Sequence, residues 1–230
     1  MKTIGLLGGM SWESSSAYYR IINETVKERL GGFHSARCIL YSVDFADIEA
    51  LQHAGRWPEA AQALIAAARG VERAGADFLL LCTNTMHKVA DHVQAGIGIP
   101  LLHIADAAAE RIKAAGLQKV GLLGTRFTME QDFYRERLVR KHGLAVVIPE
   151  AEERDLVHRV IYDELCLGVI RDESRAQYRH VMHGLVRAGA EGIIMGCTEI
   201  ELLVQPEDSP VPVFPTVRIH AEAAVDYALR

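Results

Sequence analysis

The sequence repeats itself at a spacing close to half of its length. Three segments of the first half recur in the second half in the same order. The pairs are Gly5-Leu6-Leu7-Gly8 with Gly121-Leu122-Leu123-Gly124, Arg73-Ala74-Gly75-Ala76 with Arg187-Ala188-Gly189-Ala190, and Ile99-Pro100 with Val211-Pro212. The second pair leads in each half through an apolar run to a Cys-Thr dipeptide. Such ordered self-similarity predicts two homologous halves.

Each half alternates short apolar runs with longer helical patterns, which is typical of a parallel sheet covered by helices on both faces. The expected strands are Thr3–Leu7, Ala36–Val43, Phe78–Leu81, Leu101–Ile104, Lys119–Gly124, Ala145–Ile148, Gly192–Met195 and Val211–Phe214. The expected helices include Ser14–Leu30, Pro58–Ala74, Glu130–His142 and Ser174–Ala188. The fold class is therefore α/β.

The repeat also sets the expected domain organisation. We expect one α/β half from residues 1–99 together with a C-terminal helix at 215–230, and a second half from residues 100–214. Homologous halves are expected to be related by a pseudo-twofold axis. Because ligands of open α/β sheets bind at the carboxyl ends of the strands, we expect the active site in a cleft between the halves.

Composition and charge exclude several classes of protein. Half of the 230 residues are apolar and the net charge is −5, with no run of basic residues, so nucleic acid is not an expected partner. Neither a signal peptide nor a membrane span is apparent, which predicts a cytoplasmic protein. The four cysteines are too widely spaced for a disulfide framework, and neither a metal site nor a bound cofactor is expected.

The glycine-rich first loop, Gly5-x-x-Gly8-Gly9, does not fit the dinucleotide-binding pattern Gly-x-Gly-x-x-Gly. We interpret it as a tight turn from a strand into a helix. The richest loops are Cys82–Thr85 in the first half and Cys197–Glu199 in the second. Threonine and asparagine side chains at a helix N-terminus can hold a carboxylate, and a cysteine there is expected to have a lowered pKa. These loops predict a nucleophile or a base that removes a proton from carbon.

Two segments and the opening loop carry a family resemblance. Leu81-Cys82-Thr83-Asn84-Thr85-Met86-His87 and Gly196-Cys197-Thr198-Glu199 resemble the two signatures of the aspartate/glutamate racemase family, and Gly5–Ser11 resembles its opening loop. The resemblance covers essentially the whole chain. The second signature, with Glu199, resembles that of the aspartate racemase branch, since glutamate racemases typically carry histidine at this position.

The resemblance implies racemisation of an amino acid, aspartate or glutamate or a broader set, without pyridoxal phosphate (PLP), and thus a role in D-amino acid metabolism. One cysteine would remove the α-proton and another would return a proton from the opposite face. It also makes a homodimer possible. The implied substrate contacts are Met10, Ser11, Gln52, Thr83, Asn84, Thr85, Thr198 and Glu199. Glu199 could orient Cys197 or receive the substrate ammonium, or it could cap its helix.

The first signature departs from the family pattern, which usually reads Cys-Asn-Thr. Here Thr83 stands between Cys82 and Asn84. Arg73 to Thr83 is ten steps, as is Arg187 to Cys197, which makes Thr83 the counterpart of Cys197. Aligning the two Cys-Thr dipeptides selects Cys82 instead. Side chains alternate along a strand, so only one of the two can occupy the position.

The expected function is therefore a PLP-independent amino-acid racemase with Cys197 as one acid/base group and Thr83 or Cys82 opposite it. A threonine hydroxyl is a much weaker acid than a thiol, so a site with Thr83 would deprotonate one enantiomer far better than the other. The alternatives are another carbon-acid enzyme, such as a decarboxylase or a cis-trans isomerase of a dicarboxylate, and a non-catalytic amino-acid-binding protein. His87, expected in the first turn of the helix after the first signature, could orient a neighbour or be a plain histidine at a helix terminus.

Overall fold

The computed structural model describes residues 1–230, which form two compact units. Unit 1 comprises Met1–Ile104 and His220–Arg230, and unit 2 comprises Ala105–Ile219. The chain therefore passes from one unit to the other within the first turns of two helices, α5 (Ile104–Ala114) and α11 (Thr216–Leu229). None of the helices is long and apolar enough to cross a membrane.

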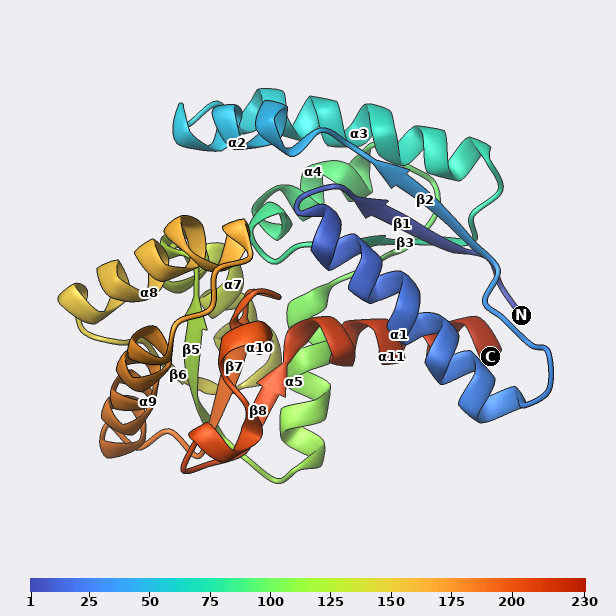
Figure 1. Cartoon of the computed structure of the whole chain (residues 1–230). Coiled ribbons are helices and arrows are strands. Elements are labelled where there is room, and N and C mark those ends of the chain that lie inside the picture. Colours follow the sequence, from blue (N-terminus) through green and yellow to red (C-terminus); the bar gives the residue numbers. More distant parts are fainter. The chain divides into compact units, whose positions relative to one another are not determined.

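Unit 1 is built on a four-stranded parallel sheet of order β2-β1-β3-β4. The strands are β1 (Ile4–Gly8), β2 (Cys38–Ser42), β3 (Phe78–Leu81) and β4 (Leu101–Leu102). The connecting helices are α1 (Trp12–Leu30), α2 (Phe45–His53), α3 (Trp57–Arg73), the 3₁₀ turn η1 (Thr85–Val89) and α4 (Ala90–Ala95). Figure 1 shows α3 over one face of this sheet and α1 over the other. Covering both faces explains why every residue of β1 and β3 is buried.

Unit 2 repeats the strand order as β6-β5-β7-β8, again all parallel. The strands are β5 (Lys119–Gly124), β6 (Ala145–Val147), β7 (Gly192–Gly196) and β8 (Val213–Pro215). Beside α5, the helical segments are α6 (Arg126–Glu130), α7 (Asp132–Glu136), η2 (Arg137–Lys141), α8 (Ala151–Asp163), η3 (Leu165–Leu167), α9 (Asp172–Arg187), α10 (Ile200–Leu203) and η4 (Pro206–Asp208). The α/β class and the two similar halves are confirmed.

One expected helix is wrong. The segment expected as a continuous helix from Glu130 to His142 is broken at Gln131, whose backbone is extended (φ −87°, ψ 148°), and it continues as α7 and the π-helical turn η2. Arg137, Lys141 and His142 each hydrogen-bond to the Asp106 carboxylate on α5, at 2.7 Å. This tertiary anchor involves a residue about thirty positions away, so the local pattern could not reveal it.

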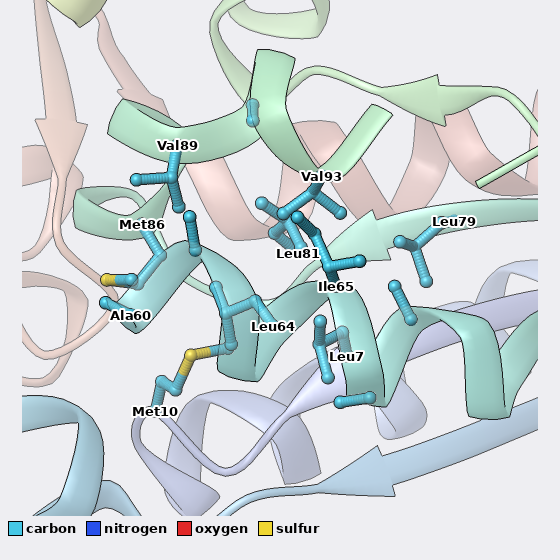
Figure 2. Close-up of a cluster of buried hydrophobic side chains, with 14 of the residues drawn as sticks. Leu7, Met10, Ala60, Leu64, Ile65, Leu79, Leu81, Met86, Val89 and Val93 are labelled. Carbon is cyan, nitrogen blue, oxygen red and sulfur yellow. The ribbon is translucent and has the colours of Figure 1, made fainter. Parts of the chain in front are cut away.

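The core of unit 1 links the sheet to the turn that follows β3. Leu7, Leu79 and Leu81 of the sheet belong to one buried cluster with Leu64 and Ile65 of α3, and Figure 2 shows these side chains facing one another. The same cluster includes Met10, Met86, Val89 and Val93. The loops after β1 and β3 are therefore both anchored in the core by a methionine.

Candidate active site

The register of the two sheets identifies the counterpart of Cys197 in the first half. Leu7 of β1 pairs with Leu81, and its repeat counterpart Leu123 of β5 pairs with Met195. One residue further along each strand, Cys82 corresponds to Gly196, and one more step equates Thr83 with Cys197. The alternative alignment, Cys82 with Cys197, would require a one-residue slip of β3, which the pairing does not show. The register favours Thr83 as the positional counterpart of Cys197.

Cys82 occupies a closed position at the end of β3. Its side chain is fully buried, its N–H donates to Leu7 O at 2.9 Å, and its carbonyl accepts from Ser14 Oγ at 3.0 Å. Its counterpart Gly196 is equally tight, since a Cβ there would lie 2.7 Å from Leu123 O. Burial raises the pKa of the Cys82 thiol far above its ordinary 9.0, so the sulfur stays protonated.

Cys197 follows β7 and is half-buried. Its Sγ–H donates to Glu199 Oε2 at 2.9 Å, and Glu199 is itself buried. Burial, and after it the negative charge of Glu199, raise the pKa of the Cys197 thiol well above its ordinary 9.0. The resting group is thus a thiol with a carboxylate in place to accept its proton.

The expectation of lowered cysteine pKa values is therefore wrong for Cys82 and Cys197 alike. The segment that follows Cys197, α10, has only four residues, and helix dipoles favour anions only modestly. Loss of water around the sulfur outweighs that effect in both loops.

The loop after β1 contains two of the expected substrate contacts, Met10 and Ser11, and the glycine that precedes them. Ser11 caps α1, with its Oγ accepting from Ser14 N at 3.2 Å. Gly9 has φ +90°, and a Cβ there would lie 2.1 Å from Val43 O, so only glycine fits. Met10 is buried in the core cluster, where Figure 2 shows it beside Leu64.

The remaining expected contacts of unit 1 lie, like that loop, at the carboxyl ends of its strands. Thr83, Asn84 and Thr85 are all buried in the turn after β3. Gln52 of α2 is also buried, and its Nε2 donates to Met86 Sδ at 3.0 Å. Its Oε1 has no hydrogen-bond partner in the chain. This oxygen is therefore an unused hydrogen-bond acceptor near the turn that follows β3.

Unit 2 brings Thr198 and Glu199 next to Cys197, and it adds a carboxyl that sequence reasoning missed. Glu201 Oε1 is buried without a hydrogen-bond partner. Burial, opposed by the charge of Arg218 and assisted by that of Glu199, raises the pKa of Glu201 to about 7. Nothing in the local sequence distinguishes it from a surface glutamate of a short helix.

The sequence also contained no sign of two hydroxyl groups that hydrogen-bond to carbonyl oxygens at the ends of β3 and β7. Ser14 Oγ donates to Cys82 O, and Thr216 Oγ1 donates to Met195 O at 2.8 Å. Both come from helices and act on carbonyls of distant strands, so no sequence signal marks them. No group of three or more His, Cys, Asp or Glu side chains is arranged to hold a metal ion.

Comparison with known proteins places this arrangement in a family. The model of the Asp/Glu/Hydantoin racemase family matches residues 7–224. The chain is 23% identical over 96% of both lengths to the broad specificity amino-acid racemase RacX of Bacillus subtilis (strain 168). It is 59% identical to a crystal structure of a proposed Asp/Glu racemase from Yersinia pestis, with a TM-score of 0.95 and full coverage of both chains.

A second crystal structure points in the same direction. An aspartate racemase homologue from Pyrococcus horikoshii OT3 is 36% identical, with a TM-score of 0.87 and full coverage of both chains. The family model spans nearly the whole chain, both halves and both cysteine-threonine loops included. The chain belongs to the Asp/Glu/Hydantoin racemase family.

Proposed function

We propose that this protein is an amino-acid racemase that works without PLP, by removing the Cα proton of its substrate and returning a proton to the opposite face. The observation that carries the proposal is the Cys197–Glu199 pair, a thiol already hydrogen-bonded to a buried carboxylate. Family membership and the broad-specificity relative support it. We expect the activity in the cytoplasm, where thiols stay reduced.

Cys197 is the proposed base for one enantiomer. The Sγ proton passes to Glu199, the thiolate then takes the Cα proton, and the electron pair of the broken C–H bond delocalises into the substrate carboxylate. The anion needs hydrogen bonds aimed at that carboxylate. Asn84, Thr85 and Thr198 are the proposed donors, together with Ser11. These roles follow from residue type and from positions at the carboxyl ends of β1, β3 and β7.

Thr83 is the proposed group on the opposite side of the substrate. Its hydroxyl gives a proton to the carbanion and regains one from water, so the hydroxyl acts as a relay and no alkoxide accumulates. The hydroxide left behind is neutralised by the proton that Glu199 took from the thiol, which returns Glu199 to its carboxylate form. A hydroxyl is a poor base for the reverse step because its pKa is far above that of a thiol. Cys82 stays the alternative occupant of this role, although its burial disfavours it.

The substrate ammonium has two proposed acceptors. Gln52 Oε1 has no partner in the chain, and Glu199 can accept once its hydrogen bond with the thiol is released. Neither group carries a positive charge that could bind an acidic side chain. Family membership supports aspartate and glutamate as substrates, and without an assigned basic partner we propose them as part of a broader range. Met10 is proposed as an apolar contact that shapes the pocket.

Incubation with each enantiomer of the common amino acids in D2O tests the function. The racemase predicts loss of the Cα–H signal in proton NMR, appearance of the other enantiomer and no release of carbon dioxide. Release of carbon dioxide would instead indicate a decarboxylase. Thermal stabilisation by an amino acid without exchange would indicate a binding protein.

Matched variants assign the roles. C197S should lose exchange, whereas C38S, which removes a half-buried thiol of the edge strand β2, should keep it. T83A should lose racemisation and T83S should retain most of it, because serine keeps the hydroxyl. An inactive C82S beside an active T83A would transfer the role to Cys82.

A further inference from the structure

His87 lies in the turn after β3, four residues beyond Thr83, and is buried. Its Nδ1 is 2.7 Å from the carbonyl oxygen of Thr83. Its Nε2 lies 3.2 Å from the backbone nitrogen of Ile104, the first residue of α5. The imidazole therefore bridges the Thr83 backbone and the chain segment that follows β4.

The two partners fix the tautomer of this ring. A backbone N–H can only donate, so the Nε2 atom facing Ile104 carries no proton. A carbonyl oxygen can only accept, so the Nδ1 atom facing Thr83 carries the proton. His87 is thus the neutral Nδ1–H tautomer with both nitrogens bonded to backbone, which excludes it as the group that exchanges a proton with substrate.

Neighbouring aromatic rings restrict movement of the imidazole. The ring of His103 lies 4.5 Å from that of His87 between centroids, and the ring of His220 lies 5.9 Å away. His220 is held in turn, with Nε2 2.9 Å from Leu102 O and Nδ1 2.8 Å from the Tyr18 hydroxyl. All of these side chains are buried. The ring of His87 is accordingly fixed in a packed cluster.

The second half of the chain has no equivalent of this bridge. The sheet register that equates Thr83 with Cys197 also equates Thr85 with Glu199 and His87 with Glu201. The Cys197 carbonyl accepts from Ile200 N at 3.3 Å, whereas Glu201 Oε1 has no hydrogen-bond partner. Cys197 is instead held through its side chain, by Glu199. The half without a thiol–carboxylate pair is the half with a histidine bridge to the backbone.

We propose that His87 is a positioning residue for Thr83. Its hydrogen bond to the Thr83 carbonyl fixes the backbone from which the Thr83 hydroxyl projects, and so sets the distance between that hydroxyl and the substrate carbon. This inference rests on the proposed function. Proton transfer is sensitive to such placement, since a displacement of about 1 Å can cost on the order of 100-fold in rate.

Two conservative substitutions separate the two bonds of His87. In H87N the amide nitrogen takes the place of Nδ1 and can still donate to Thr83 O, but the side chain no longer reaches Ile104. In H87Q the amide oxygen takes the place of Nε2 and can accept from Ile104 N, but the donor to Thr83 is lost. Each variant removes one buried hydrogen bond and part of one ring, so similar losses of thermal stability are expected.

The turnover of the two variants should differ. H87N is expected to keep kcat within about threefold of the parent, and H87Q to lose roughly 10- to 100-fold in kcat with KM nearly unchanged. Y18F is the control, because it removes a hydrogen bond to His220 without touching Thr83. Equal kcat losses in H87N and H87Q, or a change confined to KM, would overturn the proposal.

Hydrogen exchange of the backbone gives a second readout that does not require turnover. The amides of residues 82–87 should lose protection in H87Q and keep it in H87N. Equal protection in both variants would overturn the bridge itself, and lost protection with unchanged kcat would overturn its positioning role. A parent enzyme without Cα exchange would refute the proposed function, a result distinct from an active parent whose H87Q variant is equally active.

Discussion

Replacing Glu201 with glutamine should make the protein more stable at pH 8 but not at pH 4. The structure raises the pKa of this carboxyl from its ordinary 4.5 to about 7, chiefly by burial, with Arg218 opposing and Glu199 adding to the rise. A carboxyl with a raised pKa binds its proton more tightly in the folded state. Its ionisation therefore lowers the free energy of unfolding as pH rises from about 4.5 to about 7.

The size of the effect follows from the shift. Each pKa unit corresponds to about 1.4 kcal/mol, so the rise from 4.5 to about 7 sets an upper limit of about 3 kcal/mol. Glu201 is only partly buried as a residue, and its charged form can turn toward water. We therefore expect a gain of about 1 to 2 kcal/mol for E201Q above pH 7.

Thermal and urea unfolding of E201Q and the parent at pH 4, 5, 6, 7 and 8 measures this difference. The control is E207Q, which removes a carboxylate from an exposed position six residues further along the chain and corrects for the change in net charge. A stability difference between E201Q and the parent that is flat from pH 4 to pH 8 would refute the reasoning. So would a loss of stability in E201Q at pH 8.

Two further predictions concern the Asp106 anchor of unit 2 and the Gly9 turn of unit 1. Asp106 would have a raised pKa from burial alone, but hydrogen bonds from Arg137, His142 and Lys141 hold the pKa of its carboxyl well below its ordinary 3.8. The ionised carboxylate stabilises the fold above pH 3.8, and this stabilisation is lost as pH falls toward the lower pKa of the folded state. D106N should therefore lower the free energy of unfolding in urea by about 2 kcal/mol at pH 7 and by less at pH 3. Equal losses at the two pH values would contradict this prediction. G9A should reduce kcat at least tenfold and lower Tm by several degrees, because Gly9 has a positive φ and its added Cβ would collide with Val43 O. A G9A protein with parental Tm and turnover would show that the loop tolerates another backbone path.

Much of the sheet could be predicted because its strands are continuous apolar runs between turn residues. The expected strands Phe78–Leu81 and Lys119–Gly124 have the same bounds as β3 and β5. The edge strand β2 is shorter than the expected Ala36–Val43, since its ladder with β1 ends where β1 ends, at Gly8 opposite Ser42. Apolar periodicity marks a buried strand well but does not report how long its neighbour is.

In the site, too, residue positions could be predicted from spacing along the chain, whereas properties that depend on contacts between distant elements could not. Counting from the repeated arginines selected Thr83, and the strand register selects the same residue, because both depend on the spacing between elements. The pKa values of Cys82 and Cys197 could not be predicted, since they depend on how completely distant elements remove water from the sulfur. The His87 bridge was equally hidden, because its second partner, Ile104, belongs to a later element.

Cys197 and Thr83 are proposed to act on the substrate as chemically unlike groups. The two enantiomers have equal free energy, so kcat/KM for racemisation is equal in both directions and cannot report the difference. Deuterium wash-in with retention of configuration can, because a thiol with Glu199 beside it can exchange its proton with solvent before returning one.

The most direct measurement is this wash-in from each enantiomer in D2O, for the parent and for T83C. We expect one enantiomer of the parent to exchange at least tenfold faster with retention than the other. T83C should raise the rate of the slower exchange and so reduce the difference between the two enantiomers. Equal wash-in from both enantiomers in the parent, unchanged in T83C, would contradict this expectation.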